Sequence, residues 1–158
     1  LRDHVILVGF GRVGSAIGAV FREHHIAHVI LEQDHDKVVA LRPQGIPIRY
    51  GDATRAGVLQ EANVAQARLL IMATPDPYQN LAAIELARAA NPTIHTIART
   101  HSEDERKYLE SQGVSLALVA EHELALGLAH FALAQMGCAE AQANAAIAAA
   151  RQRPRVAS

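Results

Sequence analysis

A glycine-rich hexapeptide, Gly-Phe-Gly-Arg-Val-Gly at positions 9–14, directly follows the apolar run Val-Ile-Leu-Val at positions 5–8. A helical pattern starts inside the hexapeptide, so the order is that of a strand, a tight turn and a helix. In such a turn the first glycine permits the bend, the second lets a phosphate approach the backbone, and the third lets helix and strand pack closely. Free amide groups and the positive end of the helix dipole then face the anion. We therefore expect a phosphate-binding turn made of Gly9, Phe10, Gly11, Arg12, Val13 and Gly14.

Apolar runs of strand length alternate with helical segments along the rest of the chain. We expect strands at residues 4–8, 28–31, 46–50, 69–73, 94–98 and 116–119, and helices at residues 12–23, 36–42, 55–62, 77–90 and 102–111. The last of these helices begins with a capping box, Ser102 followed three positions later by Glu105. Six strands with helical crossovers indicate an α/β, Rossmann-like, doubly wound parallel sheet. Ligands of such sheets bind at the carboxyl ends of the strands.

The character of the chain changes after position 119. Residues 121–136 and 139–151 are predicted to be helical, with Gly137 kinking or separating the two stretches. The first stretch carries more apolar side chains than a last Rossmann helix needs: Leu124, Leu128, Phe131 and Met136. We thus expect a nucleotide-binding Rossmann domain at 1–120, a C-terminal helical extension at 121–151 for dimerisation, and a disordered tail at 152–158.

Composition narrows the function classes. The 158 residues carry 15 basic and 16 acidic side chains, so no overall field attracts nucleic acid. A single cysteine, Cys138, excludes an internal disulfide framework and fits a reducing compartment. We expect no signal peptide, because the first residues lead directly into a strand, and the sequence has no apolar run long enough to span a bilayer. Its start at leucine hints at a fragment of a longer protein, whose missing part could be membranous.

Polar residues at the ends of the next strands extend the predicted site. Glu32 ends the second strand near the spacing of a ribose-binding acid, and Gln33 follows it. The Glu32 carboxylate can accept both ribose hydroxyl protons and would repel a 2′-phosphate, so NAD or AMP is favoured over NADP. Asp52 and Ala53 follow the third strand. They either line an adenine pocket or form a turn in which Asp52 or Thr54 caps the next helix.

The fourth and fifth strands end over the same cleft, at Thr74 and Arg99. Arg99 could neutralise a phosphate, or it could pair with Asp76 or Glu121; the sequence leaves both readings open.

Two rival functions are weaker. A small NAD-dependent oxidoreductase needs a second surface that brings a substrate against the nicotinamide, and no such domain follows the sixth strand. Neither Tyr78 nor Tyr108 has a lysine at Tyr-x-x-x-Lys spacing.

The nine histidines raise the question of a metal site. However, His24, His25 and His28 span a helix–strand junction with no cysteine or carboxylate to complete a tetrahedral set. A further hypothesis is that His122 and His130, on one helix face, tune assembly near neutral pH.

Several motifs together resemble the RCK/KTN domain of the TrkA-N type, over about residues 3–134. They are the hexapeptide at 9–14 with Arg12, Glu32, Gly-Asp-Ala-Thr at 51–54, Ile-Ala-Arg at 97–99, and Gly113 followed by Val-Ala-Glu at 119–121. The chain is most similar in motif to the cytosolic C-terminal domain of Kef-type and YbaL-like monovalent cation:proton antiporters.

The resemblance implies a non-enzymatic cytoplasmic module at the inner face of the cell membrane. It would be joined to a transmembrane cation transporter domain, normally in the same polypeptide, and would bind NAD(H) or AMP to bias transport. Residues carried over by motif are Gly9, Gly11, Arg12 and Gly14 for phosphates, Glu32 for ribose, Asp52 and Ala53 for adenine, and Thr74, Arg99 and Glu121 for the far end of the cleft. Family domains dimerise through the segment at 121–136. No second ligand-binding subdomain follows here, which favours a homodimer over an octameric ring.

Overall fold

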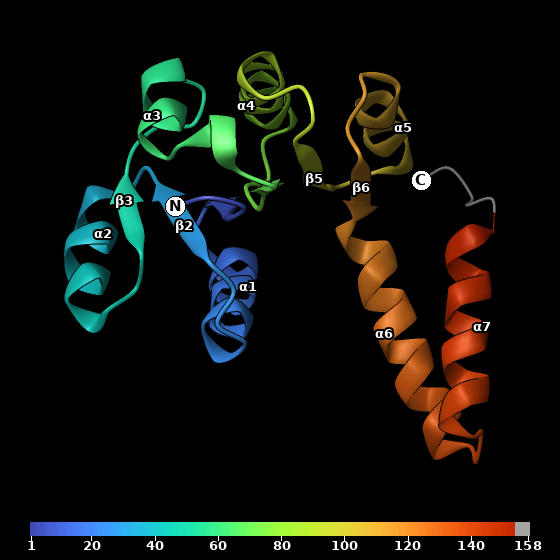
Figure 1. The fold of residues 1–158 in the computed structure, drawn as a ribbon. Helices are drawn as coiled ribbons and strands as arrows, with labels where there is room; N and C mark the ends of the chain where they lie inside the picture. The colour runs from blue at the N-terminus through green and yellow to red at the C-terminus, as the bar shows by residue number, and fades with distance from the viewer. Residues whose placement is uncertain (154–158) are drawn as a thin grey trace.

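The structure, a computed structural model, describes residues 1–153. Within that range six strands form one parallel sheet in the order β3-β2-β1-β4-β5-β6 (Figure 1). The strands are β1 (Val5–Val8), β2 (His28–Glu32), β3 (Ile48–Tyr50), β4 (Leu69–Met72), β5 (His95–Thr100) and β6 (Leu116–Val119). The order reverses between β1 and β4, which is the switch point of a doubly wound sheet. The predicted Rossmann-like fold is confirmed.

Helices connect each strand to the next. They are α1 (Arg12–Glu23), α2 (His35–Leu41), α3 (Ala56–Glu61), α4 (Pro77–Ala90) and α5 (Glu103–Ser111), with short 3-10 turns at Arg42–Gln44 and Val64–Gln66. Two more helices, α6 (Ala120–Gln135) and α7 (Glu140–Gln152), follow the sheet. Figure 1 shows α3, α4 and α5 on one face of the sheet and α1 and α2 on the other.

The central strands are buried on both faces, which explains their uninterrupted apolar sequences. In β1, Ile6 and Val8 belong to the core cluster that also holds Ile84 of α4. Val5 and Leu7 point the other way, into a smaller cluster with Val38 of α2. The sheet thus separates two cores, and of the two only the first includes a residue of β6, Ala117.

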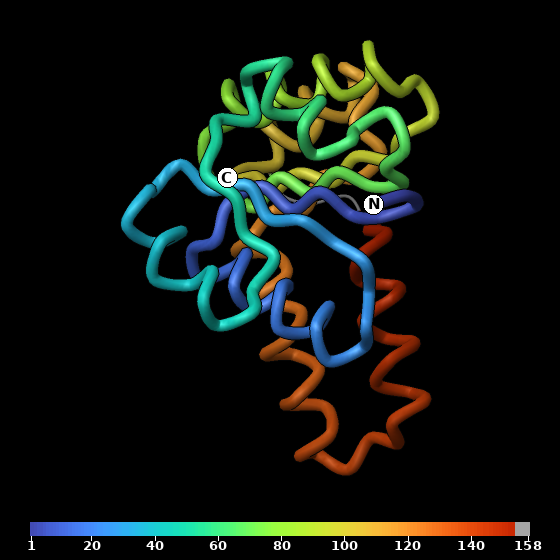
Figure 2. Tube along the Cα trace, turned by 60° about the vertical axis from the view of Figure 1, so that its left-hand side comes forward, coloured from blue at the N-terminus to red at the C-terminus, as the bar shows by residue number. Residues whose placement is uncertain are grey.

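The buried strand residues of the smaller core come from β3, β2, β1 and β4 but not from β5 or β6, because α1 and α2 cover only part of that face. Farther along the same face, Ile97 and Leu118 are only half-buried and Leu116 is 42% exposed. The helix α6 leaves β6 on this side and projects away from the sheet, and α7 returns antiparallel to it (Figures 1 and 2). Half of one sheet face therefore lacks a helix from the Rossmann body.

Two polar links close the α6–α7 hairpin. The Arg151 guanidinium bonds both oxygens of Glu123, at 2.8 and 3.2 Å, and the His130 ring contacts the Asn144 side-chain oxygen at 2.8 Å. The chain reverses at Gly137, whose φ of +92° favours glycine. Gly137 thus separates two helices rather than kinking one.

A few element boundaries differ from the prediction. The third strand begins at Ile48 instead of residue 46, because Pro47 has no N–H for the ladder and Gly45 reverses the chain with a φ of +79°. The helix α7 continues to Gln152, one residue into the predicted disordered tail; residues 154–158 of that tail lie outside the described residues. Within residues 1–153, no helix has the length and apolar character needed to cross a membrane.

Candidate functional site

A cleft of about 380 Å³ lies at the carboxyl ends of β1, β2, β4 and β5. This is where a doubly wound sheet binds its ligands. Seven of the residues proposed from the sequence line it: Gly9, Phe10, Gly11, Glu32, Gln33, Thr74 and Arg99. Residues from four separate strand ends therefore meet in one cavity, as the sequence pattern predicts.

The glycine turn is built so that side chains are excluded at its first and last glycines. Gly9 has a φ of +96°, and a Cβ there would lie 2.8 Å from the Thr74 methyl group. A Cβ at Gly14 would overlap the carbonyl oxygen of Gly9 itself. At Gly11 the added atom would meet nothing within 4 Å, so this position opens onto free space where a phosphate can approach.

The first turn of α1 presents unoccupied donors. Its N-cap is Gly11, which supplies no side-chain hydrogen bond, and no acidic side chain lies in the first turn. Asp34 caps α2, Asp76 caps α4 and Ser102 caps α5, whereas α3, α6 and α7 also begin without a side-chain cap. An uncapped helix start at a glycine turn suits an anionic group.

Glu32 holds the glycine turn in addition to facing the cleft. Its Oε1 accepts the Phe10 N–H at 3.0 Å and its Oε2 accepts the Asp34 N–H at 3.0 Å. Burial alone would raise the pKa of the Glu32 carboxyl, but the N–H donors of Asp34 and Phe10 and the Lys37 ammonium hold this pKa below its usual range. The carboxylate is thus ionised and fixed, with acceptor capacity left for two hydroxyl groups.

Lys37 is a cleft residue that sequence reasoning missed. Its ammonium lies 3.5 Å from Glu32 Oε1 and donates to the Phe10 carbonyl oxygen at 3.3 Å. It comes from the first turn of α2, three residues after the Asp34 cap, and lines the same cleft. The signal that could have indicated it in the sequence is its position, five residues after Glu32.

Asp52 forms a local turn. Its Oδ1 accepts the Thr54 hydroxyl at 2.6 Å and the Thr54 N–H at 2.9 Å, and the hydroxyl is the main cause that lowers the Asp52 pKa. The Gln33 amide reaches the same oxygen at 3.5 Å, which ties the turn to the cleft rim. Ala53 is 2% exposed within the core and does not line the cleft.

The ends of β4 and β5 are joined by Asn80, a fully buried residue of α4. Its amide donates to the Thr74 carbonyl at 2.9 Å and to the Arg99 carbonyl at 3.4 Å, while its oxygen accepts the Thr74 hydroxyl at 2.5 Å. Asn80 therefore sets the positions of two predicted site residues. No motif in the sequence points to it, because its partners lie in other elements.

Arg99 forms neither of the ion pairs that the sequence left open. Asp76 is occupied as the α4 cap, accepting the N–H groups of Tyr78 and Gln79, and Glu121 is exposed on α6. In residues 1–153 no carboxylate pairs with Arg99; its Nη1 donates to the Ala73 carbonyl at 3.3 Å, and its Nε is buried without a partner. This arrangement fits the phosphate reading of Arg99 better than a structural ion pair.

A second, apolar cavity of about 290 Å³ lies on the half-covered sheet face, between α1, β5, β6 and the start of α6. We call it the α1–α6 groove. Its wall is mostly aliphatic and includes Val13, Ile17, Ile97 and Leu118, with Arg99 and Glu123 as the charged members. Val13 thus lies outside the cleft. Glu121 lines neither cavity, whereas Glu123, two residues on, lines the groove.

Arg12 and Gly14 complete the predicted set. Arg12 is exposed at the first position of α1, and Gly14 is buried against the turn. Both flank the cleft without forming its wall.

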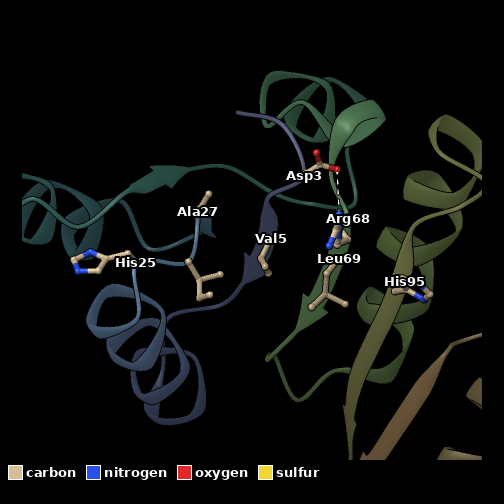
Figure 3. Close-up of a pocket in the computed structure, with 8 residues that line it drawn as sticks. Asp3, Val5, His25, Ala27, Arg68, Leu69 and His95 are labelled. Carbon is tan, nitrogen blue, oxygen red and sulfur yellow. Dashed lines mark ion pairs between the residues drawn. The ribbon is translucent and has the colours of Figure 1, made fainter.

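A third cavity, of about 510 Å³, lies at the opposite, amino end of the strands. Figure 3 shows the ion pair of Asp3 and Arg68, 3.7 Å apart, with His25 and His95 on opposite sides of it. The side chains of Asp3 and Arg68 are 80% and 71% exposed, so their ion pair adds little to the stability of the fold. No group of three histidine, cysteine or acidic side chains in the described chain is placed to hold a metal ion.

Residues 5–120 match the family model of the TrkA-N domain. The chain is 36% identical over 143 residues to the glutathione-regulated potassium-efflux system protein KefC of Cronobacter sakazakii, covering 90% of this chain and 23% of that protein. It therefore spans about a quarter of the length of this curated relative.

Two solved structures share the fold closely. The TrkA-N domain of the inner membrane protein YbaL of Escherichia coli superposes with a TM-score of 0.76 at 34% identity, covering 81% of this chain and 95% of that chain. The C-terminal domain of Kef from Shewanella denitrificans, in an AMP-bound form, gives a TM-score of 0.76 at 25% identity, covering 95% and 91%. The second match includes the length of the helical extension.

Proposed function

The chain belongs to the TrkA-N domain family, and we propose that it is the regulatory nucleotide-binding domain of a potassium or other monovalent cation transporter, such as a cation:proton antiporter. In this proposal the domain lies on the cytoplasmic side of the inner membrane. It binds an adenine nucleotide, AMP or NAD(H), and has no catalytic step of its own.

The observation that carries this proposal is the pairing of the glycine turn with Glu32. The turn leaves open space at Gly11 before an uncapped helix start, and the fixed Glu32 carboxylate, which accepts the Phe10 N–H at 3.0 Å, lines the same cleft. A phosphate fits the first and a ribose the second. The AMP-bound form of the related Kef domain supports the same ligand class. Regulation would follow from unequal affinity of the nucleotide for two states of the transporter.

Nucleotide binding is tested by thermal unfolding with AMP, NAD, NADH and adenosine. A bound ligand at about 100 times its dissociation constant stabilises the fold by about 2.7 kcal/mol, which raises Tm by several degrees. Glu32→Gln should reduce the shift, whereas Glu61→Gln, an exposed carboxylate on α3, should preserve it. No shift with any nucleotide would overturn the proposal. Turnover of NADH with a small carbonyl compound, lost in Glu32→Gln, would support an oxidoreductase instead.

We further propose that the active unit is a homodimer in which the α1–α6 groove of each copy receives α6 of the other. The groove is mostly aliphatic, and α6 carries three largely exposed apolar side chains, Leu124 (63%), Leu128 (65%) and Phe131 (67%), with Met136 (84%) directly after the helix. Each copy has both surfaces, so two copies that exchange them reciprocally form a closed dimer with twofold symmetry.

Sedimentation of single variants tests this dimer. Phe131→Glu places a charge on the apolar face and should yield a folded monomer. Val39→Glu, at a site 58% exposed on α2, should leave the dimer intact. A dimer unaffected by Phe131→Glu and Leu128→Glu would contradict the proposed interface.

A further inference from the structure

Arg99 lines both the nucleotide cleft and the α1–α6 groove. Its backbone is fixed by the Asn80 amide, which donates to its carbonyl at 3.4 Å. The side chain extends from the end of β5 toward the turn after β4, where Nη1 meets the Ala73 carbonyl. Ala73 also lines both cavities, so one thin partition separates them.

The partition carries an uncompensated positive charge. Within residues 1–153 Arg99 has no ion pair, and its Nε is buried without a partner. Its side chain donates one hydrogen bond, from Nη1 to the neutral Ala73 carbonyl at 3.3 Å. Lys37, the other cation in the cleft wall, lies 3.5 Å from Glu32 and does not line the groove. The two cations therefore differ in pairing and in the cavities that they face.

Covering the groove would remove water from beside this guanidinium. Burying an unpaired charge is unfavourable, and pairing it with an anion removes much of that cost. A phosphate in the cleft supplies such an anion on the other side of the same side chain. The nucleotide thus lowers the cost of covering the groove without touching the surface that is covered.

We propose that Arg99 couples the two cavities, so that a phosphate bound in the cleft strengthens docking of the second copy in the groove. This coupling rests on the nucleotide binding and the dimer proposed above. It adds that the two are linked, and that nucleotide binding strengthens the dimer. Reciprocity requires that the dimer bind the nucleotide more tightly than the monomer, by the same factor.

The test measures the dimer dissociation constant by sedimentation, without ligand, with saturating AMP and with saturating adenosine. For the unmodified chain we expect AMP to tighten the dimer by about fivefold or more, and adenosine, which has no phosphate, to leave it unchanged. Arg99→Met removes the charge and keeps an apolar wall. Its dimer without ligand should be tighter than that of the unmodified chain, and AMP should shift it by less than about twofold.

Lys107→Met is the control, since it removes an exposed cation of α5 that lines neither the cleft nor the groove. Its dimer without ligand should equal that of the unmodified chain, and AMP at saturation should still tighten it. Equal dissociation constants for Arg99→Met and the unmodified chain without ligand would overturn the coupling. A chain that binds AMP and dimerises, with no effect of one on the other, would overturn the coupling alone. A chain that does neither would overturn the proposed function itself.

Discussion

At the scale of single residues, Gly14 is fixed by the backbone of its own turn. A Cβ there would overlap the Gly9 carbonyl oxygen, and backbone atoms cannot move aside as a flexible side chain can. We expect Gly14→Ala to lower the free energy of unfolding by about 1–3 kcal/mol and to weaken nucleotide binding, measured by urea unfolding and calorimetry. Gly57→Ala is its control, because a Cβ at this position in α3 meets nothing within 4 Å. A stable Gly14→Ala with normal binding would show that the turn is looser than described.

Glu32 gives the site a defined pH dependence. Because its pKa is lowered in the folded chain, its ionised form stabilises the fold at every pH above the unfolded value of about 4.3. That stabilisation is lost as the pH falls through the lowered folded value. The difference in unfolding free energy between the unmodified chain and Glu32→Gln should therefore be constant from about pH 7 to pH 5 and shrink below about pH 4. A difference that instead grows as the pH falls from about 7 to about 5 would mean that burial dominates and raises the pKa.

At the scale of elements, α5 tests the predicted capping box. The Ser102 hydroxyl oxygen accepts the Glu105 N–H at 3.2 Å, and the Glu105 carboxylate accepts the N–H of His101, one residue before the cap, at 2.8 Å. Ser102→Ala should lower the free energy of unfolding by about 1 kcal/mol. Ser111→Ala, at the exposed end of the same helix, should change it by less than about 0.5 kcal/mol. Equal effects of the two substitutions in denaturant titrations would show that the Ser102 cap does not contribute to the stability of the fold.

Elements were predictable where a local pattern carries the physical cause. The apolar runs of β1 and β4 have both faces buried, and the predicted cap Ser102 acts within a few residues of its own position. Site residues were predictable where they directly follow a strand, because the end of the strand places them at the rim of the cleft. Asn80 and Lys37 could not be found this way, because their roles depend on groups brought together by the sheet order. Glu121 was expected at the far end of the cleft, but helical rotation at the start of α6 exposes it and turns Glu123 toward the groove.

At the scale of the whole molecule, the sheet face left open by α1 and α2 is what separates this chain from a self-contained Rossmann domain. The groove wall is mostly aliphatic, the exposed face of α6 is apolar, and the chain has a formal net charge of only −1. Association should therefore be driven by apolar burial, which salt screens little, whereas the nucleotide phosphate is held by charges and dipoles.

Raising the ionic strength from about 50 to 500 mM should thus separate the two events. We expect the dimer dissociation constant, measured by sedimentation without ligand, to change by less than about threefold. The dissociation constant for AMP, measured on the monomeric Phe131→Glu variant, should rise by more than that, because Arg99 and the α1 terminus act electrostatically. Using the monomer keeps the linkage between the two events out of the measurement. A dimer that dissociates in salt would place ion pairs, rather than the aliphatic groove, at the centre of the interface.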